Sequence, residues 1–135
     1  MTDRTLAVDV VVFKGADVLL IRRAHEPFKG QHALPGGFVK GDETVEQAAA
    51  RELAEETGLT DIPLRLVGVF SEPGRDPRGR VVSIAFLANL GDHEVTLRAG
   101  DDAASVEWMR IGDTDLLAFD HGEILDKALG QAIGR

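Results

Sequence analysis

The 135-residue sequence has no cysteine and no long apolar run. Without cysteine, the chain has no disulfides, thiolate metal sites, iron–sulfur clusters or cysteine nucleophiles. No segment approaches the roughly 18 apolar residues of a membrane span, and the polar start lacks the basic and apolar regions of a signal peptide. We therefore expect a cytoplasmic protein without a membrane partner.

An excess of positive charge is also missing. The formal net charge is −8, which argues against a surface that binds nucleic-acid phosphates. Six acidic residues and only two basic ones fall within 37–59, whereas short basic stretches lie at 21–30 and 71–80. An acidic centre with basic flanks favours a divalent metal that holds a small phosphorylated ligand.

The rest of the composition fits one globular α/β domain over residues 1–135, with 44% hydrophobic and 28% charged residues. Residues 24–31 carry loop residues, and 33–39 indicate extended chain broken by a glycine pair. Apolar runs and alternation predict further strands over 5–13, 18–21, 64–70, 80–88 and 106–111.

The best-marked element is a helix between Thr44 and Gly58. Thr44 is a good N-cap, Gln47 completes a capping box, and Gly58 can end the helix in the left-handed conformation. Helical spacing is also present over 113–117 and 121–133. The second of these has an apolar stripe that predicts core packing, formed by Ile124, Leu125, Ala128, Leu129 and Ile133.

Glu52, Glu55 and Glu56 have i, i+3 and i+4 spacing on the first helix, which places neighbouring carboxylates within about 6 Å. The projection puts them on the same face as the apolar residues, where acids need a neutralising partner. Oxygen donors select a hard ion, so Mg²⁺ or Mn²⁺ is the expected cofactor. The alternative is a solvated acidic face that pairs with Arg51.

Residues 37–59 satisfy the pattern G-x5-E-x7-R-E-U-x-E-E-x-G-U at every position, where U is aliphatic. The matching residues are Gly37, Glu43, Arg51, Glu52, Leu53, Glu55, Glu56, Gly58 and Leu59. A random window would match with a probability on the order of one in a billion. This pattern is the Nudix box, and the chain resembles the Nudix hydrolase family, which implies an α/β/α sandwich with a mixed β-sheet.

The resemblance implies metal-assisted attack of water on the diphosphate of a nucleoside diphosphate derivative. Glu52, Glu55 and Glu56 match the catalytic, metal-binding acids of the family. The carbonyl of Gly36 matches a backbone ligand of the metal, and Arg51 matches the arginine that orients the acids. A surface salt bridge is the alternative role for Arg51.

The roles of several further acids stay open. Glu43 matches the first acid of the box, and a structural role fits it as well as a direct one. Glu52 is our candidate general base, although a metal-bound carboxylate is a poor base. Asp101 and Asp102 could supply the base or an additional metal ligand, or could simply form a loop turn.

Residues 75–79 read Arg-Asp-Pro-Arg-Gly and resemble a segment of the ADP-ribose pyrophosphatase branch. We expect Arg75 and Arg78, with Arg23 from the other basic stretch, to bind substrate phosphate oxygens. Arg78 is favoured over Arg75 because Gly79 lets the backbone and a ligand approach closely. The alternative is a basic turn without a ligand. His32 stands where this branch usually has tryptophan, which would weaken or alter stacking on the base.

Three functions compete. We expect hydrolysis of ADP-ribose to AMP and ribose 5-phosphate, while modified nucleoside triphosphates or dinucleoside polyphosphates are alternative substrates. A ligand-sensing module without catalysis is the alternative of another class, but such regulators continue into a winged-helix domain, and only 24 residues follow Ile111. The oligomeric state is open, with a homodimer as one option. His25, His93 and His121 are isolated, and we expect structural or surface roles for them.

Overall fold

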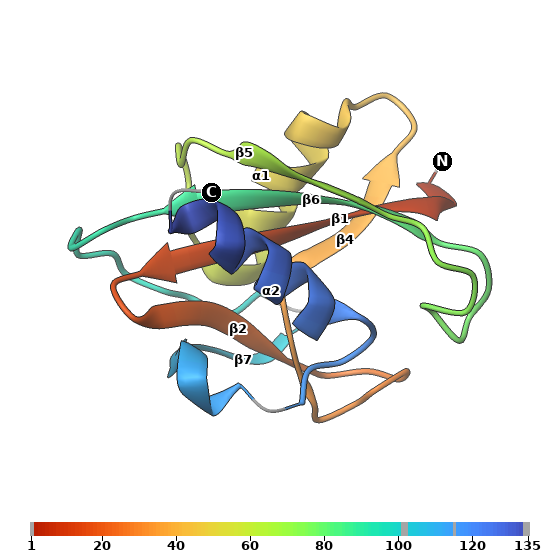
Figure 1. Cartoon of the computed structure of the whole chain (residues 1–135). Helices are drawn as coiled ribbons and strands as arrows, with labels where there is room; N and C mark the ends of the chain where they lie inside the picture. Colours follow the sequence, from red (N-terminus) through yellow and green to blue (C-terminus); the bar gives the residue numbers. More distant parts are fainter. Residues whose placement is uncertain (1, 101–102, 115, 134–135) are drawn as a thin grey trace.

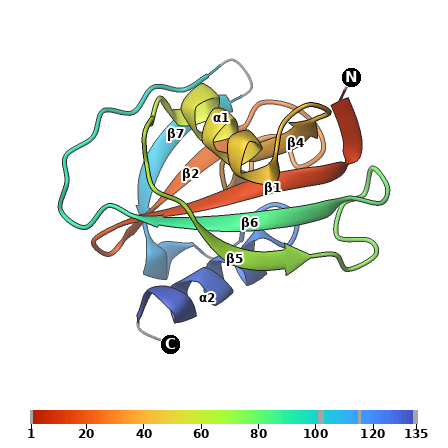
Figure 2. The same cartoon turned by 90° about the horizontal axis from the view of Figure 1, so that it is seen from above.

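The computed structural model describes residues 2–100, 103–114 and 116–133. Within these ranges the chain forms a seven-stranded mixed sheet with one helix on each face (Figures 1 and 2), as expected for the α/β/α sandwich. The elements are β1 (Thr2–Lys14), β2 (Asp17–Arg23), β3 (His32–Ala33), β4 (Gly36–Lys40), α1 (Val45–Thr57), β5 (Arg65–Phe70), β6 (Val82–Asn89), β7 (Ala103–Arg110) and α2 (His121–Ala132). Neither helix has the length or apolarity for a membrane crossing in the described part of the chain.

Strand β1 is the centre of the sheet. On one edge it runs parallel to β6, whose other edge pairs antiparallel with β5. On its other edge β1 pairs first with β4, where Asp9 lies opposite Gly36, and then with β2, where Lys14 lies opposite Asp17. Since β3 pairs with β2, residues 32–40 lie between the diverging strands β1 and β2 and bring two glycines to the middle of the sheet.

The predicted first helix is confirmed at both ends. Thr44 and Gln47 form both hydrogen bonds of the capping box, and Gly58 closes the helix at a φ of 82°. One core cluster packs the apolar residues of α1 against one face of β1, with Ala48, Ala49 and Leu53 beside Val8, Val10 and Val12. The acids of α1 are thereby carried to the neighbourhood of β4.

Helix α2 covers the opposite face. Because side chains alternate along a strand, Val11 and Phe13 of β1 point to this face and join Ile124, Leu125 and Ala128 in a second core cluster. The predicted apolar stripe is confirmed at these positions but is wrong at Ile133, which lies just past the end of α2 and is 61% exposed.

Of the helix expected over 113–117, the described residues 113, 114, 116 and 117 form no α-helix. A 3₁₀ turn spans Ile111–Asp113 instead, after which the hydroxyl of Thr114 donates to the Ile111 carbonyl. The chain then runs to the sheet edge, where Leu117 bridges His32 and the Ala118 N–H donates to the His32 carbonyl over 2.8 Å. These tertiary hydrogen bonds compete successfully with a short helical repeat.

Candidate active site

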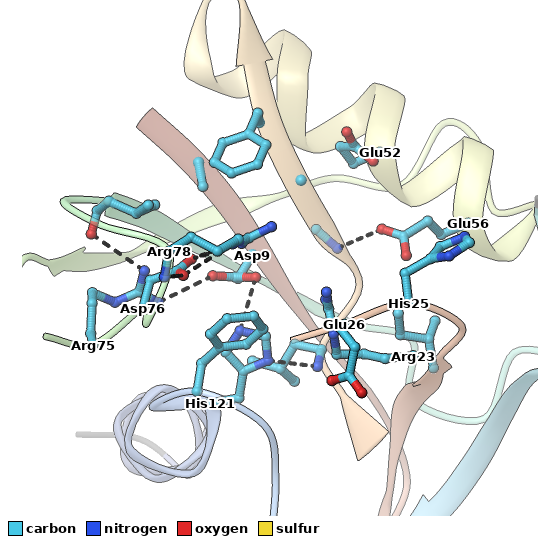
Figure 3. Close-up of a pocket in the computed structure, with 18 residues that line it drawn as sticks. Asp9, Arg23, His25, Glu26, Glu52, Glu56, Arg75, Asp76, Arg78 and His121 are labelled. Carbon is cyan, nitrogen blue, oxygen red and sulfur yellow. Dashed lines mark hydrogen bonds and ion pairs between the residues drawn. The ribbon is translucent and has the colours of Figure 1, made fainter. Parts of the chain in front are cut away.

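A pocket of about 480 Å³ lies where β1, β4, α1 and the loop before α2 meet. Figure 3 shows Glu52 and Glu56 approaching from α1, Asp76 and Arg78 from the loop after β5, and His121 from α2. Its lining also includes Asp9, Arg23, His25, Glu26, Gly36, Gly37, Phe38, Arg75 and Phe119. The pocket lining therefore combines the carboxylates of α1 with guanidinium groups from β2 and from the loop after β5.

Glu56 is fixed to the sheet. The N–H of Gly36 donates to its Oε1 over 2.8 Å, and the residue is only 6% exposed. A carboxylate that is taken from water in this way requires hydrogen bonds to its oxygens, which the backbone of β4 supplies. The expected acid and the expected backbone ligand, Gly36, are thus adjacent in the pocket lining.

Arg51 holds the remaining acids of the motif together. Its Nη1 donates to Glu52 over 3.0 Å and to Glu55 over 3.2 Å, and its Nη2 donates to the Phe38 carbonyl over 3.0 Å. Its Nε and Nη2 donate to Glu43. The hydrogen bonds from Arg51 hold the pKa of Glu43 at about 2, and Glu43 in turn raises the pKa of Arg51. Because Glu43 does not line the described pocket, this geometry favours its structural role.

The three expected metal-binding acids are only partly gathered. Within the described residues, no group of three or more acidic, histidine or cysteine side chains is close enough to hold a metal ion. Arg51 draws Glu55 toward itself, and the Glu55 side chain is 56% exposed outside the pocket lining. Arg51 therefore neutralises part of the negative charge of these carboxylates, a role that the sequence pattern assigned to a metal ion.

The pocket nevertheless fits a hard divalent ion. A Cβ atom on Gly37 would lie 2.2 Å from Glu52 Oε2, so the missing side chain leaves the space that this carboxylate occupies. Glu52, Glu56 and the backbone of Gly36 offer only oxygen donors within the same lining. Oxygen donors of this kind are the ligands that Mg²⁺ and Mn²⁺ prefer.

Arg78 is held at the pocket wall by Asp76. The Asp76 carboxylate accepts the Arg78 backbone N–H over 2.8 Å and its Nη2 over 2.7 Å. Burial alone would raise the pKa of Asp76, but the hydrogen bonds from Arg78 outweigh burial and lower it. The guanidinium of Arg78 also lies 5.0 Å from the ring centroid of Phe38 and 5.5 Å from that of Phe119.

Arg75 has a different setting, although it belongs to the same segment. Its side chain is 4% exposed, and the guanidinium donates to both carboxylate oxygens of Asp120, over 2.9 and 2.7 Å. Burial disfavours its charge, but the hydrogen bonds to Asp120 leave the pKa of Arg75 raised. These hydrogen bonds tie the loop to the start of α2, and although Arg75 also lines the pocket, its expected contact with substrate stays a prediction.

Arg23 lies on the pocket wall beside Arg78. Its Nε donates to the Pro27 carbonyl over 2.6 Å, and its guanidinium lies 4.9 Å from the Phe119 ring centroid. Burial and the nearby charge of Arg78 both lower the pKa of Arg23. Two guanidiniums that repel each other at a pocket wall would be stabilised by a bound anion.

Sequence reasoning missed several pocket residues. Phe119 gave no signal because its aromatic role depends on a turn with a φ of 56°. Asp9 did give a sequence signal, since an acidic residue within a valine-rich strand needs hydrogen-bond or ion-pair partners when it is buried. His32 lies outside the described pocket lining and contacts Glu107 over 2.8 Å.

Asp101 and Asp102 lie outside the described residues, and their role stays a prediction. Their neighbours on either side are described. The Gly100 N–H donates to the Glu56 carbonyl over 3.2 Å, and the Ala103 N–H donates to the Gly100 carbonyl over 3.4 Å.

The NUDIX domain family matches residues 3–128. An ADP-ribose pyrophosphatase of Methanocaldococcus jannaschii is 49% identical over 120 residues, which make up 89% of this chain and 70% of that protein. The NUDIX domain of Shewanella oneidensis NrtR, solved with ADP ribose, superposes with a TM-score of 0.88 at 29% identity and covers 98% of this chain and 90% of that one.

A bifunctional NMN adenylyltransferase/ADP ribose pyrophosphatase of Francisella tularensis, solved with AMP and a manganese ion, superposes with a TM-score of 0.85 at 32% identity. The match covers 97% of this chain and 42% of that protein. Several other relatives are also longer, and this chain spans 40% and 63% of two of them.

Proposed function

This chain belongs to the Nudix family, and we propose that it hydrolyses ADP-ribose to AMP and ribose 5-phosphate with Mg²⁺ or Mn²⁺. The observation that carries the proposal is a single pocket in which Glu52 and Glu56 face the guanidiniums of Arg23 and Arg78. The 49% identity to an ADP-ribose pyrophosphatase supports the choice of substrate. A diphosphate needs cationic partners along its length, and this arrangement offers them on both sides once a metal is bound.

The residues that would hold the metal are Glu52, Glu56 and the carbonyl of Gly36, and we propose that Glu55, now outside the pocket lining, would join them. When bound, the ion neutralises the diphosphate and lowers the pKa of a coordinated water. Arg51 orients Glu52 and Glu55 through its Nη1, while the Gly36 N–H keeps one oxygen of Glu56 in place. Glu52 is our candidate for the base that receives the proton of the attacking water.

The reaction exchanges one phosphorus–oxygen bond for another. The oxygen of water forms a bond to one phosphorus, and the bond from that phosphorus to the bridging oxygen breaks. One phosphate stays with adenosine and the other with ribose. Arg23 and Arg78 would stabilise the negative charge that develops on the phosphate oxygens, since both are held by neighbouring groups before substrate arrives.

The aromatic rings beside these arginines have a role in positioning. Phe38 and Phe119 lie against Arg78, and Phe119 also packs edge-on against Phe28 with centroids 4.7 Å apart. Rings on a pocket wall present apolar surface to a ribose or a base. We propose that they restrict where the uncharged parts of the substrate lie, and that they compensate for the base stacking that His32 would weaken or alter.

Two alternatives remain testable. Modified nucleoside triphosphates or dinucleoside polyphosphates would use the same acids, and a sensing domain would bind ADP-ribose without cleaving it. A product assay over ADP-ribose, these nucleotides and other nucleoside diphosphate derivatives, with Mg²⁺ and with Mn²⁺, separates the three. We expect the highest kcat/KM for ADP-ribose. A higher kcat/KM for another nucleotide would make that nucleotide the assigned substrate in place of ADP-ribose. Binding of ADP-ribose without turnover in either metal would favour the sensing domain.

A further inference from the structure

We propose that Asp9 and His121 are positioning residues, which fix the backbone of residues 34–36 and through it the carboxylate of Glu56. The inference rests on the proposed function, because it concerns the same pocket and the same metal-binding acid. Figure 3 shows Asp9 in the middle of this arrangement, with the dashed contact to His121 on one side and Glu56 on the other.

His121 anchors the segment through Leu34. The Leu34 N–H donates to His121 Nδ1 over 2.9 Å, and the histidine is only 4% exposed. An imidazole nitrogen that accepts a hydrogen bond carries no proton, so this contact assigns the proton of the neutral ring to Nε2. His121 Nε2 lies 3.3 Å from Asp9 Oδ1, where this proton faces the carboxylate.

Asp9 anchors the segment through Gly36. The two residues are partners across β1 and β4, and a Cβ atom on Gly36 would lie 2.5 Å from Asp9 Oδ1 and 2.2 Å from the Val8 carbonyl. The carboxylate therefore packs directly against the glycine backbone. Ser83 donates to Asp9 Oδ2, and Arg75 Nη2 lies 3.9 Å from the same oxygen. Held from several sides, Asp9 leaves Gly36 little freedom to shift.

The consequence reaches the metal-binding acid because the N–H of Gly36 is the donor to Glu56 Oε1. The contacts run from α2 through His121 and Asp9 to Gly36, and from there to Glu56 on α1. These contacts connect the two helices through the sheet, and no local sequence feature predicts such a connection. A displacement of the 34–36 backbone would move the donor that orients Glu56, and catalytic groups tolerate little displacement.

A purely structural role would not require these residue types. An aspartate and a histidine lose their hydration when buried, and apolar side chains of similar size usually stabilise such a position as well or better. Asp9 lies instead among the valines of β1 and His121 at the start of α2, and each contacts the backbone of residues 34–36. Groups that orient metal ligands typically change metal affinity or activity by about 10- to 100-fold when removed.

The test compares two replacements of His121 and measures Mn²⁺ binding without substrate, by calorimetry or by the electron paramagnetic resonance of the free ion. His121→Leu removes the acceptor for the Leu34 N–H, whereas His121→Asn keeps an oxygen near the position of Nδ1. We expect His121→Leu to weaken Mn²⁺ binding about 10-fold or more and to lower kcat at least as much as it raises KM. His121→Asn should recover most of the Mn²⁺ affinity.

Leu125→Ala is the matched control, because Leu125 is buried on the same helix and does not line the described pocket. It should lower Tm and leave Mn²⁺ affinity unchanged. Mn²⁺ binding by His121→Leu equal to wild type, or an equal loss in Leu125→Ala, would overturn the proposal. So would a His121→Asn variant that binds no better than His121→Leu.

Asp9→Asn keeps the test open if His121→Leu fails to fold. The amide preserves size and loses charge, so we expect a several-fold loss of Mn²⁺ affinity, and wild-type affinity would again overturn the proposal. Failure of the proposed function looks different. A wild-type chain that binds Mn²⁺ and does not cleave ADP-ribose would contradict the assigned reaction and leave the comparison of Mn²⁺ affinities valid.

Discussion

Gly37 lies so close to Glu52 that a Cβ atom at position 37 would be 2.2 Å from Glu52 Oε2. The nearest atoms belong to a flexible carboxylate, which can move away. The preceding glycine differs, because a Cβ at Gly36 would lie 2.2 Å from the Val8 carbonyl oxygen, which belongs to the backbone of the central strand. The absence of a side chain at Gly37 therefore allows the position of Glu52, whereas its absence at Gly36 allows β1 to pair with β4.

Gly37→Ala and Gly36→Ala should separate activity from stability. We expect Gly37→Ala to displace the Glu52 carboxylate and lower kcat by 10-fold or more, while the midpoint of urea unfolding changes little. Gly36→Ala should lower both activity and stability, with a loss of about 1–3 kcal/mol from overpacking. Denaturant titrations and kinetics on the same preparations check this. An active Gly37→Ala enzyme would show that the position of Glu52 is not critical.

Glu43 should make stability depend on pH in the acid range. Its folded pKa is about 2, below the ordinary value of 4.5, because Arg51 donates to its carboxylate. A depressed folded pKa adds stability above the unfolded value, and this contribution is lost as the pH falls from about 4.5 to about 2. Glu43→Gln should therefore flatten the pH dependence of the unfolding free energy in that window.

Asp42→Asn is the control for this experiment, since Asp42 is exposed and adjacent in the chain. It should keep the wild-type pH dependence of the unfolding free energy between pH 4.5 and 2. A Glu43→Gln profile that parallels wild type would mean that the ion pair with Arg51 contributes nothing measurable to folding.

Replacing Arg78 should affect substrate binding, whereas replacing Arg75 should affect stability. Arg78→Ala is expected to raise KM for ADP-ribose by roughly 10- to 100-fold, equivalent to about 1.4–3 kcal/mol for a charge-assisted contact, and to affect a plain nucleoside triphosphate less. Arg75→Ala leaves the partly buried Asp120 carboxylate without its partner and should lower Tm markedly. An equal rise of KM for both substrates in Arg78→Ala would show that the loop does not select between them.

Glu56 tests the dependence on metal. Glu56→Gln should lower kcat at least about 100-fold with little change in the fold, because the Gly36 N–H can still donate to the amide oxygen. Excess chelator should abolish turnover by the wild-type enzyme, and added Mg²⁺ or Mn²⁺ should restore it. Full turnover in chelator would contradict metal-dependent catalysis.

Local patterns predicted the parts of the fold that depend on local chemistry. The capping residues Thr44 and Gly58 fixed both ends of α1, and the strands were found by their apolar runs. The fixed residues of the Nudix box and their spacing also identified the family. The short helix over 113–117 was wrong, since hydrogen bonds to the distant His32 decided that segment.

In the candidate site, residues of the same type have different contacts, and only the tertiary structure shows which contacts each one makes. Arg75 and Arg78 belong to one short segment, and only the position of Asp120, 45 residues farther along, makes Arg75 a tether. The contact between Asp9 and His121 depends on the packing of the last helix against the first strand. No periodicity or motif could bring these side chains together.

The most direct test of the account is a time course of ADP-ribose with the purified chain and Mg²⁺, in which both products are quantified by chromatography. We predict equal amounts of AMP and ribose 5-phosphate, formed as ADP-ribose disappears. Intact ADP-ribose at a concentration that demonstrably saturates the pocket, in Mg²⁺ and in Mn²⁺, would contradict the central claim and make the chain a binding module.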